Sequence, residues 1–416
     1  MKNPITTVIF IGILLLLDFY IFNVAKSVTQ DCTARNKQLI AFSFWTISIL
    51  SVFAFLVVAF FPPNTLSKSI SVAVFATIVG IFIAKLFASC IFLIDDCRRL
   101  IQYVATQGYH LFTRQQSTHT INISRSAFLS WLGITGGAGL LGTLFIGFSN
   151  KYNYRVVHQK LSFSNLPAAF KGLKIVHISD IHSGSFLDSQ AVEKGIALIN
   201  AQQADVVFFT GDLVNNTASE MDVYQSMFAE IAAPLGVFSV LGNHDYGDYV
   251  QWPLAGVSKE ENLTQLKQVH AAMGWKLLMN EHVVLEKNNE QIALIGVENW
   301  GAKARFPKYG KLDKAYAGAE GYPFKILLSH DPSHWDAEVR KHYADIDLTL
   351  SGHTHGMQFG LEIPGFKWSP IQYLYKQWAG LYMHGSQHLY VNRGFGFLGY
   401  PGRVGVMPEI TVIEMI

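Results

Sequence analysis

Residues 173–182 read LKIVHISDIH, an apolar run that ends in Asp180 and His182. A short run of apolar, partly β-branched residues is typical of a buried strand. Side chains two positions apart at the end of an extended segment lie on the same side of the chain, so Asp180 and His182 can both reach one metal ion. The sequence therefore predicts a strand that presents metal ligands at its carboxyl end.

The same pattern occurs four more times along the chain. The apolar runs predict strands over 205–210, 237–241, 326–328 and 348–350. The polar residues that follow these runs are Asp212; Asn243, His244 and Asp245; His330; and His353 and His355. Because ligand sites of α/β sheets lie at the carboxyl ends of the strands, we expect these side chains to lie close together.

From about residue 152 the chain alternates short apolar runs with helical stretches, which is the pattern of an α/β domain. Further strands are predicted over 292–297, 389–392 and 410–414. Helices are predicted over 189–202, 219–232 and 258–273, and each of them opens with a serine that we expect to be its N-cap.

The predicted ligands are carboxylates, imidazoles and one amide, because all three cysteines lie in the first 100 residues. This set suits divalent ions such as Mn, Fe, Zn or Co. Seven candidates exceed the needs of one ion, so we expect a pair about 3.5 to 4 Å apart that clamps a phosphoryl group and lowers the pKa of a bridging water. Gly211, Gly242 and Gly352 precede ligands, where a missing side chain permits close approach of the backbone.

The ordered motifs Asp-x-His, Gly-Asp, Gly-Asn-His-Asp, a strand-end His and Gly-His-Thr-His resemble the calcineurin-like metallophosphoesterase family, from about residue 173 to the end of the chain. The resemblance is closest to the membrane-attached bacterial branch, which typically has a stretch like Asn392-Arg393-Gly394 followed by one like Pro408-Glu409-Ile410. It implies a two-sheet β-sandwich flanked by helices, and hydrolysis of phosphate esters with two divalent metal ions.

The resemblance also implies roles. The ligands of the first ion are Asp180, His182 and His355, and those of the second ion are Asn243, His330 and His353. Asp212 bridges the two ions, and the bridging hydroxide attacks phosphorus in line. His244, oriented by Asp245, protonates the leaving alkoxide or contacts the phosphate. Asn243 can also donate its amide hydrogens to a phosphate oxygen. Asp245 stands where many family members have glutamate.

Each motif alone has a structural explanation, because a Gly-Asp pair is usually a turn and an isolated histidine is usually a core residue. Five motifs in order favour a metal-dependent phosphoric ester hydrolase. One alternative is a catalytically silent membrane sensor that binds metal or phosphate. Another is a transporter with an accessory domain, for which Asp18 and Lys85 are the only candidates for a polar path.

Residues outside the motifs are also candidates for substrate contact. Arg393 lies in a Gly-flanked turn, where its guanidinium can bind a phosphate or form an ion pair. His334 follows the His330 motif and can border the substrate cleft, although a structural role is the expectation for it. The same structural role is expected for His177, His342, His384 and His388.

An aromatic stretch over 359–382 includes Trp368, Tyr375 and Trp378, with Lys367 and Lys376 interleaved. Tryptophan and tyrosine beside lysine favour a membrane interface. We hypothesise that this segment lies over the bilayer and admits a lipid with a phosphodiester or diphosphate head group. The alternative is an aromatic flap that packs on the sandwich.

The front of the chain differs from the back. Half of the 416 residues are apolar and only 15% are charged, and the mean hydropathy is positive. Four segments, 5–25, 39–61, 70–94 and 127–149, have the length of membrane spans. We therefore predict an all-α transmembrane anchor over 1–150 and a metallophosphoesterase domain over 151–416. Asp18 and Lys85 lie at similar depth in two of the spans, which predicts that they pair.

The distribution of basic residues favours one orientation of the anchor. The first and third connections carry Lys26, Arg35, Lys37, Arg98, Arg99, Arg114 and Arg125, and the opposite side carries Lys2 and Lys68. Basic connections stay in the cytoplasm, so we predict an integral protein of the inner or plasma membrane with an extracytoplasmic catalytic domain. The net charge of +2 argues against a nucleic-acid partner, and the bilayer and a phosphate ester are the partners that we expect.

Overall fold

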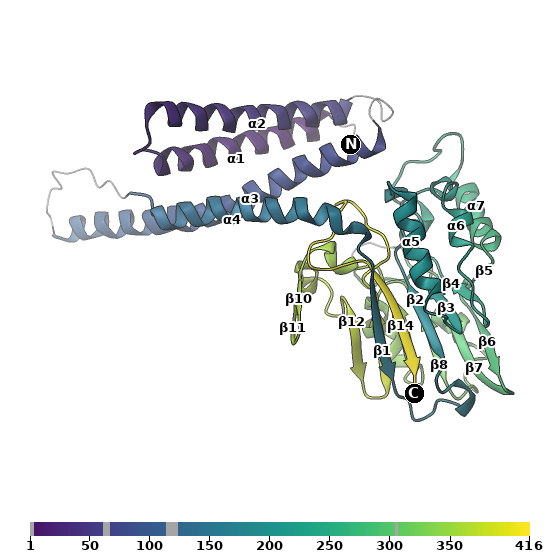
Figure 1. Ribbon diagram of the computed structural model, residues 1–416. Coiled ribbons are helices and arrows are strands. Elements are labelled where there is room, and N and C mark those ends of the chain that lie inside the picture. Colours follow the sequence, from purple (N-terminus) through teal and green to yellow (C-terminus); the bar gives the residue numbers. More distant parts are fainter. Residues whose placement is uncertain (1–3, 61–66, 114–123, 304–306) are drawn as a thin grey trace. The chain divides into compact units, whose positions relative to one another are not determined.

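The computed structural model describes residues 4–60, 67–113, 124–303 and 307–416. The chain divides into two units, Met1–Ile146 and Gly147–Ile416 (Figure 1). Two of the basic residues counted for the orientation, Lys2 and Arg114, lie outside the described residues.

The first unit contains four apolar helices, as predicted, and each of them is long enough to span a membrane. They are α1 (Pro4–Val28), α2 (Ala34–Phe60), α3 (Lys68–Thr113) and α4 (Ala127–Ser149). Helix α3 is much longer than the predicted span over 70–94, because the charged run at 95–99 contains no residue that breaks a helix.

Glycines of α4 pack against α3. A β-carbon added to Gly133 would lie 2.3 Å from the Phe92 ring, and one added to Gly137 would lie 3.0 Å from the Ala84 carbonyl oxygen. Small residues permit this approach of helices in a membrane. Lys85 forms an ion pair with the buried Asp18, which confirms the predicted pairing. Its ammonium group also donates to the hydroxyl of Ser48 at 3.3 Å.

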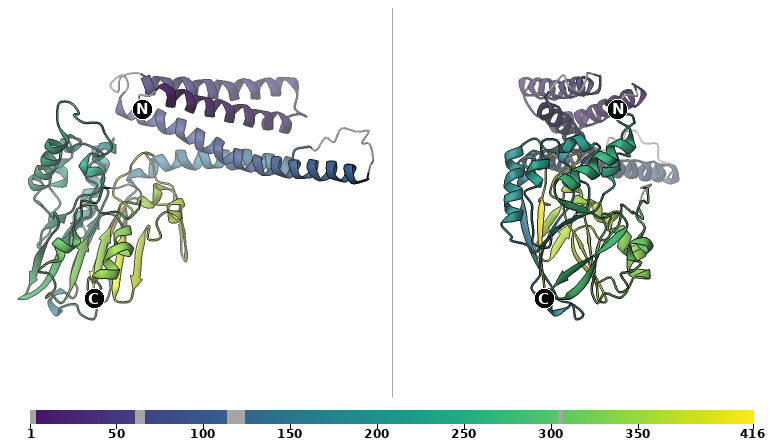
Figure 2. Two further views of the ribbon diagram at one scale, coloured as in Figure 1. Left: turned by 180° about the vertical axis from the view of Figure 1, so that it is seen from behind. Right: turned by 90° about the vertical axis from the view of Figure 1, so that its right-hand side faces the viewer.

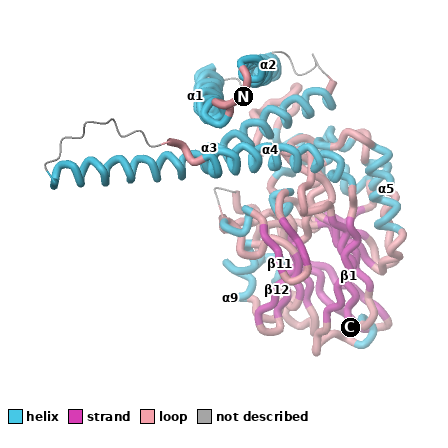
Figure 3. The backbone as a smooth tube through the Cα atoms, turned by 60° about the vertical axis from the view of Figure 1, so that its left-hand side comes forward, coloured by secondary structure: helices cyan, strands magenta, loops and turns pink. Residues whose placement is uncertain are grey.

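The second unit contains two six-stranded sheets (Figure 2). The first has the order β1-β14-β2-β3-β4-β5, formed by Arg155–Leu161, Glu409–Met415, Lys174–Ile178, Val206–Phe209, Val237–Ser239 and Trp275–Leu277. The second has the order β12-β13-β9-β8-β7-β6, formed by Gly380–His384, Gln387–Val391, Leu348–Ser351, Lys325–Leu328, Glu290–Gly296 and Glu281–Lys287. A separate hairpin of β10 (Leu361–Ile363) and β11 (Phe366–Trp368) lies beside β12 (Figure 3).

The sheets face each other across an apolar core to which both contribute, including Phe208 of β3 and Leu328 of β8. Helices α5 (Ser189–Asn200) and α7 (Lys259–Ala272) pack on the outer face of the first sheet. Helix α8 (Leu312–Tyr316) packs on the outer face of the second sheet. The predicted α/β sandwich flanked by helices is confirmed.

The helix predicted over 219–232 is wrong. The chain forms a single turn over Ala218–Met221 and a four-residue helix α6 (Gln225–Phe228) instead. The carboxylate of Glu220 accepts hydrogen bonds from the backbone N–H groups of residues 215, 216 and 217, and this fixes a tight turn. The N-cap of α5 is Asp188 and not the predicted serine, whereas Ser258 caps α7 as predicted.

The carboxyl ends of β2, β3 and β4 lie at one edge of the first sheet, because these strands pair in parallel. Strands β7, β8, β9 and β13 also run in parallel in the second sheet. The polar residues that follow the strands of each sheet are thereby brought to one edge of it.

Candidate metal centre

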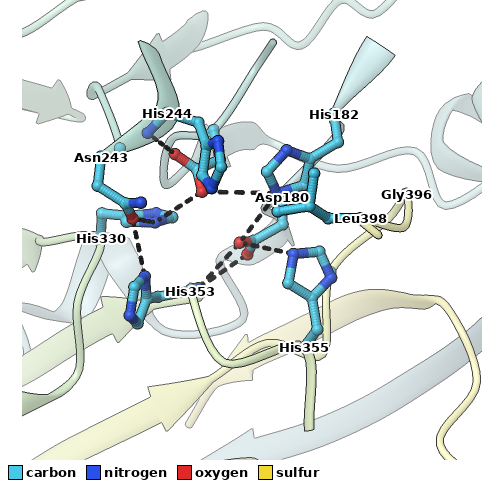
Figure 4. A network of polar contacts seen from close by, with 12 residues as sticks. Asp180, His182, Asn243, His244, His330, His353, His355, Gly396 and Leu398 are labelled. Carbon is cyan, nitrogen blue, oxygen red and sulfur yellow. Dashed lines mark hydrogen bonds and ion pairs between the residues drawn. The ribbon is translucent and has the colours of Figure 1, made fainter. Parts of the chain in front are cut away.

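Six of the predicted ligands form two groups at the strand ends (Figure 4). Within each group, one ligand atom from every member lies within 4.8 Å of the others. The first group is Asp180, His182 and His355, and the second group is Asp212, His330 and His353. The residues come from four different strand ends of both sheets, so the centre exists only when the sandwich is assembled.

Asp212 lies between the two groups. Its Oδ2 atom is 3.2 Å from Nε2 of His330 and 3.5 Å from Nε2 of His182. The seventh predicted ligand, Asn243, joins the second group, because its Oδ1 atom lies 3.1 Å from Nε2 of His330 and 2.8 Å from Nδ1 of His353. The Asp212 carboxylate therefore lies within reach of imidazoles from both groups.

Five of the seven predicted ligands adopt a left-handed backbone conformation that non-glycine residues rarely take. They are Asp180, His182, Asp212, His353 and His355, with φ between 48° and 69°. Such residues cost about 1 to 3 kcal/mol each and cluster at functional sites. The left-handed turn directs each side chain away from the course of its strand, and the sequence carries no signal for it.

Two glycines make room for the carboxylates, as predicted. A β-carbon on Gly242 would lie 2.2 Å from Oδ1 of Asp212, and one on Gly352 would lie 2.2 Å from Oδ2 of Asp180. Real β-carbon contacts are longer than this, so any side chain at these two positions displaces a predicted ligand.

The donor set fits divalent cations. Among the described residues, the buried Nε2 atoms of His182 and His355 have no hydrogen-bond partner, and both face carboxylates. The opposite ring nitrogens of two imidazoles are held in place: Nδ1 of His330 lies 2.7 Å from the Thr210 carbonyl oxygen, and Nδ1 of His182 lies 3.1 Å from Oδ1 of Asn215. Contacts of this kind orient metal-binding histidines.

Burial and charge set the protonation of this centre. Burial lowers the pKa of His182 to about 3, so this imidazole is neutral and free to bind a cation. Burial also opposes the charged form of His330. The attraction of the Asp212 carboxylate for the charged imidazole is the larger effect, and it raises the pKa of His330 to about 10. A cation that binds His330 must displace this proton, and metal binding is therefore expected to tighten as the pH rises.

His244 lies beside both groups, with its ring 5.0 Å from the ring of His182. The predicted orientation of His244 by Asp245 is wrong. Nδ1 of His244 lies 2.8 Å from the Asn215 carbonyl oxygen. The carboxylate of Asp245 points back to the turn after β3, where it accepts hydrogen bonds from the backbone N–H groups of residues 212, 213, 214 and 242.

The three residues suggested for substrate contact are engaged with protein groups. Arg393 forms ion pairs with Glu362 and Glu409, which is the ion-pair alternative. The ring nitrogens of His334 lie 2.9 Å from the Ser329 hydroxyl and 3.0 Å from the Glu338 carboxylate. Trp368 is on β11, and its indole N–H donates to Tyr373 at 3.4 Å. Substrate contact by these three residues stays a prediction.

Four residues at the centre were not predicted. Asn215 holds His182 and His244. The hydroxyl of Tyr249 accepts a hydrogen bond from the Asn243 amide at 2.8 Å, and its ring lies 4.5 Å from the ring of His244. Asp331 and Tyr375 lie behind His353. Only Asp331 had a local signal, since it directly follows His330.

Two family models match this chain. Residues 173–357 match the family model described as calcineurin-like phosphoesterase. Residues 2–151 match a second model, described as the transmembrane domain of a probable calcineurin-like phosphoesterase. The chain belongs to the calcineurin-like phosphoesterases. It is therefore a hydrolase with an N-terminal membrane domain.

Relatives of this phosphoesterase occur in vertebrates and bacteria. A Danio rerio transmembrane protein with a metallophosphoesterase domain is 31% identical over 63% of this chain and 57% of its own length. The uncharacterized metallophosphoesterase YkuE of Bacillus subtilis is 29% identical over 70% of this chain and 98% of its own length. The phosphodiesterase YaeI of Escherichia coli is 28% identical over 63% of this chain and 88% of its own length.

Proposed function

We propose that residues 151–416 are a dinuclear metal-dependent phosphoesterase domain, which residues 1–150 tether to a membrane. The substrate class is a phosphomonoester, a phosphodiester or a diphosphate. The observation that carries the proposal is the position of Asp212, whose carboxylate lies within 3.5 Å of imidazoles from both ligand groups.

The proposed holders of one ion are Asp180, His182 and His355, and those of the other ion are Asn243, His330 and His353, with Asp212 between them. Bound divalent ions would polarise phosphoryl oxygens and lower the pKa of a water to near neutrality. Manganese, iron and zinc all suit carboxylate, imidazole and amide ligands.

His244 is proposed as the general acid. Its Nδ1–H group donates to the Asn215 carbonyl oxygen at 2.8 Å, and this contact leaves Nε2 to carry a proton to the leaving oxygen. With Nδ1 held in this way, Nε2 is the nitrogen that faces the centre, as a general acid requires. The backbone N–H of His244 donates to Oδ1 of Asp212 at 2.8 Å, which fixes the acid beside the centre.

The test is hydrolysis by the purified full-length protein in detergent. After treatment with a chelator it is incubated with Mn²⁺, Fe²⁺ or Zn²⁺ and with a panel of lipid and soluble monoesters, diesters and diphosphates. We expect turnover of at least one class only when metal is restored. Metal binding without turnover of any member would contradict the proposal and favour the sensor.

A lipid substrate is the finer proposal, and an exposed apolar patch supports it. The patch consists of Leu361, Ile363 and Phe366 of the β10–β11 hairpin together with Tyr373 and Leu374, and about half or more of each is exposed. Tyr375 and Trp378 from the same stretch are buried and pack with Val406, as a flap would. Isolated exposed apolar residues are ordinary, but a contiguous group suggests an apolar ligand or membrane.

Replacing Phe366, Tyr373 and Leu374 together by serine is expected to reduce the turnover of a phospholipid in vesicles about tenfold or more, because burial of one large apolar side chain contributes about 1.5 to 3 kcal/mol. Turnover of a small soluble ester should stay the same. The matched control is Val223→Ser, which removes an exposed apolar side chain from another part of the domain. Equal loss on both substrates would count against a lipid substrate.

We also propose that the catalytic domain is extracytoplasmic in the inner or plasma membrane. The support is the excess of lysine and arginine in the first connection and in residues 98–125, which comprise the end of α3 and the connection that follows it. Arg99 of α3 and Arg125 both pair with Asp96. Protease added to intact cells should therefore degrade the catalytic domain, and its full protection would overturn this orientation.

A further inference from the structure

His355 begins a run of four residues in the left-handed backbone region. The φ angles of residues 355, 356, 357 and 358 are 49°, 53°, 55° and 56°, and only residue 356 is a glycine. A left-handed residue other than glycine costs about 1 to 3 kcal/mol and persists only where the surrounding structure holds it. The direction of the His355 side chain therefore depends on the groups that fix this turn.

The end of the turn is tied to the loop over residues 398–404. The side-chain amide of Gln358 donates to the carbonyl oxygen of Tyr400 at 2.6 Å, and its side-chain oxygen accepts from the backbone N–H of Leu398 at 2.6 Å. The backbone carbonyl of Gln358 accepts from the N–H of Val404 at 2.8 Å. A shift of this loop would therefore shift the turn.

Arg403 of the same loop holds the beginning of the turn. Its side chain is fully buried, and the guanidinium donates to the carbonyl oxygens of His355 and Arg393 at 3.2 and 2.7 Å. Its Nη2 atom lies 3.3 Å from Nδ1 of His355, which places the guanidinium directly behind the ring. A buried charge is costly without its hydrogen bonds, so the His355 backbone and the Arg403 side chain are fixed together.

The last turn of α4 and the residue that follows it hold this loop in turn. Residues 147–150 belong to the second unit of the chain. The carbonyl oxygen of Gly147 accepts a hydrogen bond from the backbone N–H of Arg403 at 2.9 Å. The side-chain amide of Asn150 donates to the Arg403 carbonyl oxygen at 3.3 Å. Both backbone groups of Arg403 are thus bound to the end of α4.

The close approach of α4 to the loop requires a glycine. A β-carbon on Gly147 would lie 2.2 Å from the hydroxyl oxygen of Tyr400 and 2.7 Å from a methyl carbon of Val404. Real β-carbon contacts are longer than this, so a side chain at residue 147 must displace the loop. By contrast, a β-carbon on Gly142 of the same helix would meet no described atom within 4 Å.

We propose that Gly147 and Asn150 are positioning residues for His355 and that they act on it through Arg403. The inference rests on the two-ion centre of the proposed function. It gives the last membrane helix a part in metal binding, because the end of this helix belongs to the framework that holds one ligand of the first group. The effect is confined to that group, since His353 of the second group is held separately by Tyr375.

The test is a titration of the metal-free full-length protein with Mn²⁺ in detergent, with free Mn²⁺ followed by electron paramagnetic resonance. It is carried out in two backgrounds: His330→Ala leaves the first group intact, and His182→Ala leaves the second group intact. Groups that orient metal ligands contribute factors of about 10 to 100 to affinity. Gly147→Ala should therefore weaken the tightest site about tenfold in the His330→Ala background and leave that of the His182→Ala background unchanged.

A second variant and two controls accompany Gly147→Ala. Arg403→Lys keeps the charge but lacks the fork of donors that reaches several carbonyl oxygens, and it should weaken the same site about 10- to 100-fold. Gly142→Ala adds the same methyl group to the same helix, and Arg155→Lys makes the same exchange at an exposed arginine. Neither control should change the Mn²⁺ affinity in either background.

The outcomes separate this inference from the proposed function. Unchanged affinity of Gly147→Ala or Arg403→Lys in the His330→Ala background would overturn the inference alone. Equal weakening in both backgrounds would also overturn it, because it would indicate a general loss of structure. Selective weakening in a protein that hydrolyses no member of the substrate panel would overturn only the proposed function.

Thermal unfolding reports whether each variant folds. If Gly147→Ala does not fold, Asn150→Ala decides, because it removes only the hydrogen bond to the Arg403 carbonyl oxygen. Asn150→Ala should then weaken Mn²⁺ binding in the His330→Ala background alone, and unchanged affinity there would overturn the inference.

Discussion

Replacement of Asp212 by asparagine is expected to reduce metal-dependent hydrolysis about 10³-fold or more. The carboxylate lies within 3.5 Å of both His182 and His330, so its charge serves both proposed ions. Loss of a bridging charge removes several kcal/mol of stabilisation, and about 4 kcal/mol corresponds to a factor of 10³. The measurements are kcat/KM on the best substrate of the panel and the metal content per chain.

The asparagine variant should fold normally. Oδ1 of Asp212 accepts a hydrogen bond from the backbone N–H of His244, and the amide oxygen of asparagine can replace it. Asp222→Asn changes an exposed aspartate and is the matched control, with no expected effect. An Asp212→Asn variant that keeps both ions and full activity would remove the basis of the proposed function.

Replacement of His244 by alanine is expected to slow hydrolysis of an ester with an alkyl alcohol leaving group about 10²- to 10⁴-fold. An alkoxide needs a proton as it departs, whereas p-nitrophenolate is stable without one. Hydrolysis of the p-nitrophenyl ester should therefore fall far less. The measurement is the ratio of kcat/KM for the two leaving groups in the wild type and in the variant.

The leaving-group ratio separates two roles of His244. If the imidazole binds phosphate instead of donating a proton, both esters should lose the same factor. The metal content should be unchanged in either case, because His244 belongs to neither ligand group. His342→Ala removes an exposed histidine and is the control, with no change expected for either ester.

The sequence predicted the inner strands of both sheets, but it did not predict the edge strands. Every strand predicted from an apolar run is present, because these strands are buried on both faces. The hairpin strands β10 and β11 were missed. In the two sheets, strands β1, β5, β6 and β12 were missed. They are the edge strands of the two sheets, where part of each strand is exposed and polar residues interrupt the apolar run.

The sequence also predicted which residue types follow the strands, but it did not predict the hydrogen-bond partners of their side chains. His244 is held by Asn215 and not by its sequence neighbour Asp245, because a tight turn at residues 244–246 sends adjacent side chains in different directions. In the aromatic stretch, Tyr375 is buried whereas its neighbour Leu374 is exposed. Local sequence does not specify which face of an irregular segment packs inward.

The sequence by itself determined the membrane anchor, the positions of the buried strands along the chain and the chemical identity of the seven candidate ligands, because apolar periodicity and donor type are local properties. Only the tertiary structure decided which ligands share a group, which imidazole nitrogen faces the centre, and that a carboxylate lies behind His353 while a guanidinium lies behind His355. These relations join residues far apart in the chain, and only the packing of the two sheets brings such residues within hydrogen-bonding distance.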